Sequence, residues 1–214
     1  MKSMCWSIAM LIAILPTLRA QSEVIDRVLA VVAGEIITQS DVDGAVALGL
    51  VATTAASDRR GAGLGRLIER QLMLREVRRY MPPEPAQAAV EQRLQTIRQR
   101  FSSPEALTEA LAISGMDEAR LREFLRDDLR IEAYLEERFA SPTQATEDDV
   151  AAYYNEHLAD FTRAGQVSPL AEVRDTIQQK LQAQRRNAMI GDWLAGLTRR
   201  TEIIDLYLPG RPTP

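Results

Sequence analysis

Strand-forming sequence is confined to the two ends of this 214-residue chain, and that placement constrains its fold more than any other feature. Residues 24–32 are β-branched and apolar, Gly34-Glu35 makes a turn, and residues 36–38 form a short return strand. Strand character returns only at residues 202–208. Short strands leave unpaired backbone groups at their edges, so the simplest arrangement pairs the two ends with each other. We therefore predict a mainly α fold closed by a small antiparallel β element that joins the N- and C-terminal strands.

The sequence between these ends has the 3.6-residue period of helices. Start signals include Ser40 as an N-cap and the Ser-Pro pairs at 103–104 and 168–169, in which proline takes the first helical position. Three of the predicted helices span residues 66–80, 104–113 and 117–139. Three others begin at Ser40, Pro85 and Thr146, and a last helix runs from residues 168–169 to about Arg200. This last helix would be about 48 Å long. Residues 162–167 are expected to form a short polar loop, and residues 209–214 a disordered tail.

The glycine-rich stretch at residues 61–65 invites comparison with a nucleotide-binding loop. It follows a polar segment rather than a strand, lacks the GxGxxG spacing, and has no Lys-Ser/Thr pair after it. We interpret it as a mobile loop or a frayed helix start.

The N-terminus has the layout of a secretory signal peptide. Lys2 supplies a positive start, an apolar run follows, and Pro16 interrupts it before the small residue Ala20. The run is shorter than the roughly 20 residues that span a bilayer, which favours a signal peptide over a membrane anchor. We predict cleavage between Ala20 and Gln21, export to the periplasm, and no stable membrane insertion afterwards. The mature chain would hold 194 residues and no cysteine, because Cys5 is removed.

Charge patterning argues against nucleic-acid binding. Of the 26 basic residues only Lys2 and Lys180 are lysines, and an arginine excess can signal phosphate recognition. The arginines are interleaved with acids, however, as in Glu69-Arg70, and the net charge is −4. A solvated, salt-bridged surface explains this pattern better.

A single Cys and a single His exclude most catalytic constellations. One Cys allows no intramolecular disulfide and no Cys-based zinc site, and one His allows no zincin motif. His157 shares a helix face with Tyr153, Tyr154 and Phe161, which favours a partly buried core histidine over a catalytic one. We therefore predict no catalytic residue, no metal and no cofactor, and we do not expect an enzyme.

Apolar binding is the remaining function class. Methionines suit a surface that accepts varied apolar partners, although the same side chains can equally be core. The candidate client-binding residues are Met73, Met81, Phe101, Met116, Phe124 and Tyr134.

Several blocks resemble the SurA-type periplasmic chaperones, which are often fused to parvulin prolyl isomerase domains. The resemblance rests on residues 24–42, 67–74, 146–157 and 169–174, so it spans most of the chain from 21 to 208. In that family the helix after the isomerase returns to complete the N-terminal core. A parvulin domain would be expected near residues 162–168, but it needs on the order of a hundred residues, so the interval implies that the isomerase is missing.

The resemblance implies an ATP-independent chaperone for unfolded outer-membrane or secreted proteins, with unfolded client polypeptides as partners. Two alternatives stay open. One is a peptidyl-prolyl isomerase family member, and the other is a dedicated subunit of an envelope protein complex.

Overall fold

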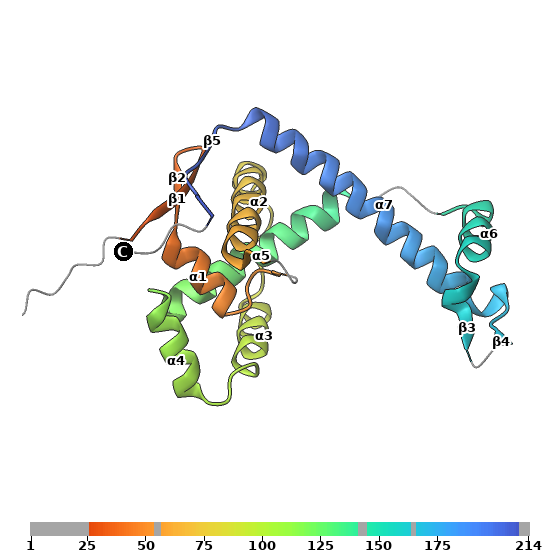
Figure 1. The fold of residues 1–214 in the computed structure, drawn as a ribbon, viewed down its shortest axis with the longest axis horizontal. Coiled ribbons are helices and arrows are strands. Elements are labelled where there is room, and N and C mark those ends of the chain that lie inside the picture. The colour runs from red at the N-terminus through yellow and green to blue at the C-terminus, as the bar shows by residue number, and fades with distance from the viewer. Residues whose placement is uncertain (1–25, 54–56, 141–144, 164–165, 210–214) are drawn as a thin grey trace, which may run out of the picture.

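The structure, a computed structural model, describes residues 26–53, 57–140, 145–163 and 166–209 (Figure 1). The predicted signal peptide, its cleavage point at Ala20 and Gln21, and residues 210–214 of the predicted tail lie outside these ranges. The described part is mainly α, as predicted. Its elements are β1 (Val28–Val32), β2 (Glu35–Thr38), α1 (Gln39–Ala47), α2 (Arg59–Tyr80), α3 (Gln87–Arg98), α4 (Pro104–Ile113), α5 (Glu118–Arg138), α6 (Glu147–Glu156), the 3₁₀ helix η1 (Leu158–Phe161), β3 (Thr162–Arg163), β4 (Gln166–Val167), α7 (Leu170–Arg200) and β5 (Ile203–Asp205).

The two ends of the chain meet in a three-stranded antiparallel sheet with the order β2-β1-β5. Val31 in the central strand is opposite Ile36 on one side and Ile204 on the other. The predicted pairing of the N- and C-terminal strands is therefore confirmed. The contact extends beyond β5, because the Leu206 N–H donates to the carbonyl of Leu29 at 2.9 Å.

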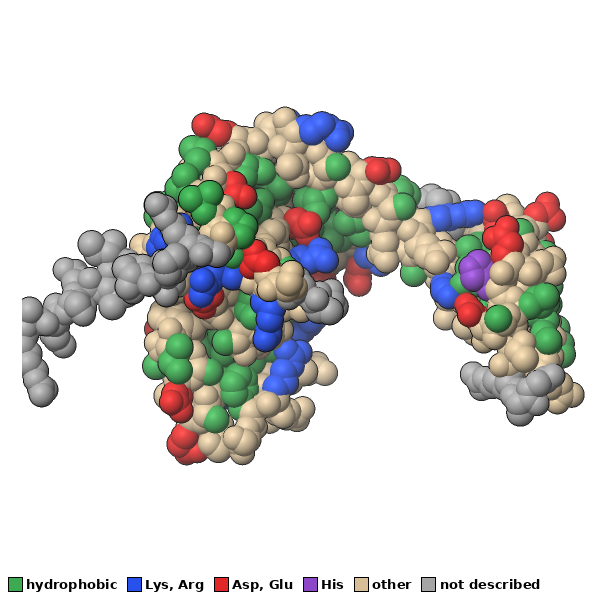
Figure 2. Space-filling view, viewed as in Figure 1, with side chains coloured by type: hydrophobic (Ala, Val, Ile, Leu, Met, Phe, Trp, Pro, Cys, Tyr) green, Lys and Arg blue, Asp and Glu red, His purple; other side chains and the backbone are tan. Residues whose placement is uncertain are grey.

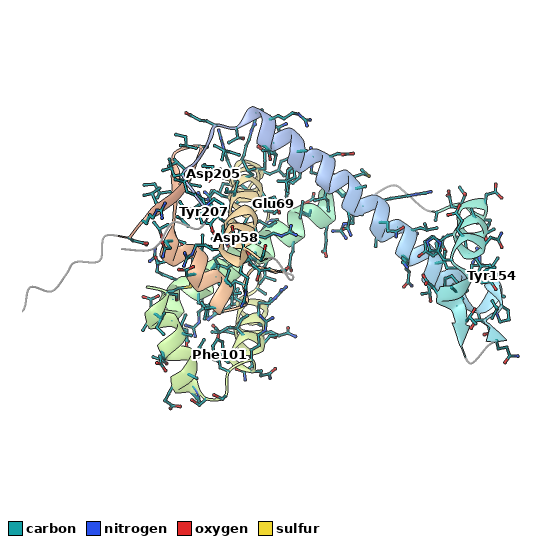
Figure 3. All side chains as sticks on the ribbon, in the orientation of Figure 1. Asp58, Glu69, Phe101, Tyr154, Asp205 and Tyr207 are labelled. Carbon is teal, nitrogen blue, oxygen red and sulfur yellow. The ribbon has the colours of Figure 1, made fainter. Side chains whose placement is uncertain are left out.

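A second long-range contact holds the end of the chain against α2. The Tyr207 hydroxyl is 2.8 Å from a carboxylate oxygen of Asp58, the N-cap of α2 (Figure 3). The same carboxylate oxygen accepts the backbone N–H of Gly61. These two bonds lower the pKa of Asp58, the N–H of Gly61 more than Tyr207.

The structure corrects two predicted helix starts near the N-terminus. Thr38, not Ser40, caps α1, because Thr38 has extended backbone angles and forms a capping box with Asp41. Ser40 lies in the first turn and bonds to the carboxylate of Asp26. Helix α2 begins at Arg59 rather than residue 66, so the glycine-rich stretch is helical. Its Gly63 faces Val46 of α1 so closely that a Cβ atom would overlap that side chain.

The structure confirms two of the later helix starts and corrects a third. Ser103 caps α4 with Pro104 in its first turn, and Asp117 caps α5, as predicted. The capping pair at 168–169 was wrong: α7 begins at Leu170, and neither Ser168 nor Pro169 caps it with a side-chain hydrogen bond. The predicted loop at 162–167 contains the short antiparallel pair β3–β4.

Most of the molecule is one helical body, here called the core lobe, which comprises the three-stranded sheet, α1–α5 and the C-terminal part of α7. Three apolar clusters fill it. One lies between the sheet, α1, α2 and the end of α7, with Leu197 at its α7 side. The second joins α3, α4 and α5 beneath α1, and the third joins the ends of α2 and α5 to α7 through Trp193.

Residues 145–181 form a separate small body, here called the distal lobe, which contains α6, η1, β3–β4 and the first part of α7. Its buried residues are Ala145, Val150, Tyr153 and Ile177. Helix α7 has 31 residues, or about 46 Å, and joins the two lobes (Figure 1). Residues 182–192 in its middle belong to no apolar cluster. Figure 2 shows an open hollow between the lobes, spanned by this part of α7.

Candidate functional site

A concave surface lies beside β2, where two small cavities adjoin. The first has a volume of about 170 Å³ and the second about 190 Å³, both below the roughly 300 Å³ at which small-molecule sites begin. They share Asp41, Arg70, Met116 and Phe124. We call their combined surface the edge groove. Its other lining residues are Ile36, Ile37, Leu67 and Gln71 in the first cavity, and Ser40, Ser114, Gly115, Arg120, Glu123 and Asp127 in the second.

Arg70 of α2 forms the fixed centre of the groove. Its guanidinium carbon lies 3.7 Å from the centroid of the Phe124 ring, a close cation–π contact. Its Nε donates to Asp128 at 2.7 Å, and an Nη donates to the backbone carbonyl of Phe124 at 3.0 Å. The Arg70 side chain is only 15% exposed, and these three contacts together hold it in one geometry. Phe124 is therefore presented on a rigid support.

Burial raises the pKa of Asp128, and the neighbouring guanidinium of Arg70 opposes that rise. The carboxylate thus depends on Arg70 for its charged form. Arg70 contacts α5 at Phe124 and Asp128, one turn apart, so the pair also joins α2 to α5. Sequence reasoning assigned such Arg–acid neighbours to a solvated surface; here the Asp128 side chain is only 28% exposed.

Close packing between α1 and the α4–α5 connection sets one wall of the groove. A methyl group on Gly44 would overlap the Cβ atom of Ser114. Ser114 is buried, and its hydroxyl donates to the carbonyl of Leu111 at 2.8 Å. Gly115 then adopts a left-handed backbone with φ of +62°. This turn brings Met116 to the groove, since Met116 bonds back through its N–H to Leu111 rather than continuing α4.

The structure separates the six predicted client-binding residues. Met116 and Phe124 line the edge groove together. Met73 packs on the cluster that contains Tyr134, which is 3% exposed and meets Trp193 at 5.9 Å between ring centroids. The other two lie elsewhere: Met81 is the exposed C-cap of α2, and Phe101 is half-buried beyond the end of α3 (Figure 3).

Sequence reasoning missed Ile36 and Arg70. Ile36 belongs to a predicted strand, and it is 59% exposed because β2 is an edge strand of the sheet in the described part of the chain. No signal in the sequence identifies Arg70, because the acid that fixes it is 58 residues away.

The predicted partial burial of His157 is confirmed. His157 is half-buried, stacks on Tyr153 with 4.0 Å between ring centroids, and its Nδ1 lies 2.9 Å from the Tyr153 carbonyl. The described residues contain no group of His, Cys, Asp or Glu side chains arranged to hold a metal ion. Among the described helices, none combines the length and hydropathy needed to cross a membrane.

No family model matches the chain. A curated protein from Azotobacter vinelandii, the putative peptidyl-prolyl cis-trans isomerase NifM, is 38% identical over 65 residues. The match covers 30% of this chain and 22% of NifM, so the chain spans about a fifth of the length of this relative.

Among solved structures, the chain is similar to one from a study of PEB4 and Cj1289 of Campylobacter jejuni, described as two structurally related SurA-like chaperones. The alignment covers 85% of this chain and all of the other, with a TM-score of 0.54 and 12% sequence identity. At this low sequence identity, the structural match establishes only that the two chains share a fold. The chain therefore has the fold of the SurA-like chaperones.

Proposed function

We propose that this protein is an ATP-independent chaperone that holds unfolded outer-membrane or secreted polypeptides in the periplasm. One observation carries the proposal: on a SurA-like fold, Ile36, Met116 and Phe124 present apolar surface in a groove with a rigid floor. The shared fold supports the class of activity, and the groove supplies a place where an apolar segment can be buried.

The dimensions of the groove favour short, weakly held segments. Each cavity accepts about one side chain rather than a folded domain. Burying one apolar side chain contributes about 1.5–3 kcal/mol, which is too little for tight binding but enough to shield a segment transiently. Reversible burial of this kind keeps unfolded chains from associating with one another, and it needs no nucleotide.

Export is part of the same proposal. The first twenty residues have the layout of a signal peptide, and the SurA-like proteins of the structural match include one named as periplasmic. We propose that residues 21–208 form the mature chaperone module, and that its partners are client polypeptides. N-terminal sequencing of the protein purified from the periplasmic fraction tests the cleavage after Ala20.

The chaperone proposal is tested by aggregation. A denatured outer-membrane β-barrel protein is diluted from urea into buffer, and light scattering is recorded with and without a stoichiometric amount of this protein. We expect the wild type to delay scattering and Met116→Ser to shorten the delay. Ile113→Ser is the matched control, because Ile113 is 78% exposed and lines neither cavity of the groove. No delay by the wild type would overturn the proposal.

A prolyl isomerase is the second candidate, favoured by the partial match to NifM. We propose that this chain does not itself catalyse isomerisation. Between η1 and α7 the described residues form only the β3–β4 pair, whereas a parvulin domain needs on the order of a hundred residues. A proline-peptide assay decides: accelerated cis–trans exchange would contradict this assignment.

Pull-down from envelope extract tests the third possibility, since one stoichiometric partner would indicate a dedicated subunit.

A further inference from the structure

The outer edge of β2 is open. Within the part of the chain that the structure describes, β2 pairs with β1 alone, and no strand lies on its other side. Proteins commonly protect such edges with charges, prolines or bulges, because an open edge can pair with another chain. Here Glu35 supplies a charge at one end, but its neighbour Ile36 is 59% exposed.

An apolar row crosses the outer face of the sheet and ends at that edge. Ile204, Val31 and Ile36 occupy opposite positions on the three strands, so their side chains lie side by side on one face. Ile204 and Ile36 are both exposed. A strand added beside β2 would place one of its own side chains next to Ile36 and continue the row.

The edge groove lies where the other face of an added strand would go. Its first cavity is lined by both Ile36 and Ile37 of β2, together with Leu67 of α2 and Phe124 of α5. Successive side chains of a strand point to opposite faces. An extended segment beside β2 could therefore cover Ile36 with one side chain and direct the next toward the groove.

The charges of the groove favour a positively charged occupant. Asp41, Glu123 and Asp127 line the second cavity, against Arg70 and Arg120. The charge of Arg70 is already matched by the carboxylate of Asp128 at 2.7 Å. Asp127 lies 3.7 Å from Arg130 and Glu35 lies 3.5 Å from Arg78, so both of these acids are paired with arginines. Asp41 and Glu123 line the groove against Arg120, which leaves a small excess of negative charge. A segment that carries lysine or arginine complements this surface.

We propose that the outer edge of β2 is a strand-addition site, which binds an extended, positively charged polypeptide segment with alternating apolar side chains. This inference rests on the proposed function, since it gives the binding mode and segment class of the same groove. Backbone hydrogen bonds to β2 supply affinity that is independent of client sequence, and the groove and its acids select apolar, basic segments.

Peptide binding tests the mode of binding. The probe is a fluorescein-labelled ten-residue peptide of alternating valine and lysine, measured by fluorescence anisotropy against the full chain. We expect the matching valine–glutamate peptide to bind at least tenfold more weakly. Methylating alternate backbone nitrogens should weaken binding at least tenfold for one of the two alternate sets, because only one set faces β2. Equal binding of the unmodified and both methylated peptides would refute strand addition.

Variants locate the site and separate it from the general chaperone proposal. Ile36→Lys should weaken binding of the valine–lysine peptide at least tenfold, whereas Ile113→Lys, at a comparably exposed isoleucine outside the groove, should leave it unchanged. Binding should also slow hydrogen exchange at Ile36, because β1 and Asp41 already accept from the N–H groups of residues 35, 37 and 38. If the wild type delays aggregation but does not bind the peptide, the strand-addition site is wrong and the proposed function stands. If it binds the peptide without delaying aggregation, the proposed function is wrong and the site stands.

Discussion

The two lobes should unfold separately, and Ile177→Ala tests this directly. Ile177 is 1% exposed and belongs to the small cluster that holds the distal lobe together. The substitution removes three carbons, or about 2.4 kcal/mol of transfer free energy at about 0.8 kcal/mol each, and the cavity left behind adds to this. We take about 3 kcal/mol as the expected loss.

Hydrogen exchange with mass spectrometry measures this loss lobe by lobe. A loss of about 3 kcal/mol corresponds to exchange faster by about 150-fold, since each 1.4 kcal/mol is a factor of ten. We expect the acceleration in α6 and residues 170–181, with α2 and α5 unchanged. Residues 182–192 of α7 carry no cluster residue, so little apolar packing couples the two lobes.

Leu197→Ala is the matched control on the same helix. Leu197 is 2% exposed and packs in the core lobe against the sheet, α1 and α2. It should accelerate exchange in the core lobe and leave α6 protected. If Ile177→Ala accelerates exchange equally in both lobes, the molecule is a single cooperative unit and the reasoning from its separate clusters is wrong.

Three further predictions concern stability. Gly44→Ala should destabilise the core lobe by about 1–3 kcal/mol in urea unfolding, because the new methyl group overlaps Ser114; an unchanged midpoint would show that α1 and α4 can separate freely. Arg70→Ala should lower the free energy of unfolding by about 2 kcal/mol at pH 7 and by less at pH 4. Burial raises the pKa of Asp128, so without Arg70 the buried carboxyl is tolerated when protonated, and this tolerance is lost as pH rises and the carboxyl ionises. An equal loss at both pH values would contradict this. Bonds from Thr146 and Arg185 lower the pKa of Asp149 to about 2, so the distal lobe should lose stability as pH falls from about 4 to about 2, and Asp149→Asn should reduce this dependence in exchange measurements.

Local signals in the sequence predicted much of the fold. The β-branched ends predicted the pairing of β1 with β5, and Ser103-Pro104 and Asp117 marked helix starts correctly. The errors arose where tertiary contacts outweighed local preference. The glycine-rich stretch is helical although glycine disfavours helix, because Asp58 caps α2 and the small Gly63 allows α1 to approach.

The candidate site was much less predictable. Methionine and aromatic content pointed to Met116 and Phe124, which line the edge groove together, but it grouped them with Tyr134, which the core lobe buries. Periodicity shows which face of a helix is apolar, yet not which neighbour covers that face. The exposure of Ile36 likewise depends on the position of β2 at the edge of the sheet.

The sequence by itself determined the helical class and the meeting of its two ends, because periodicity and strand propensity are local properties. Only the tertiary structure decided that Arg70 and Asp128 pair across 58 residues, that Tyr207 reaches Asp58 across 149, and that β2 keeps an open edge beside a groove. These features depend on where elements distant in the chain come to lie together. The free energy of burying one apolar face against another sets that arrangement, and it belongs to no single segment.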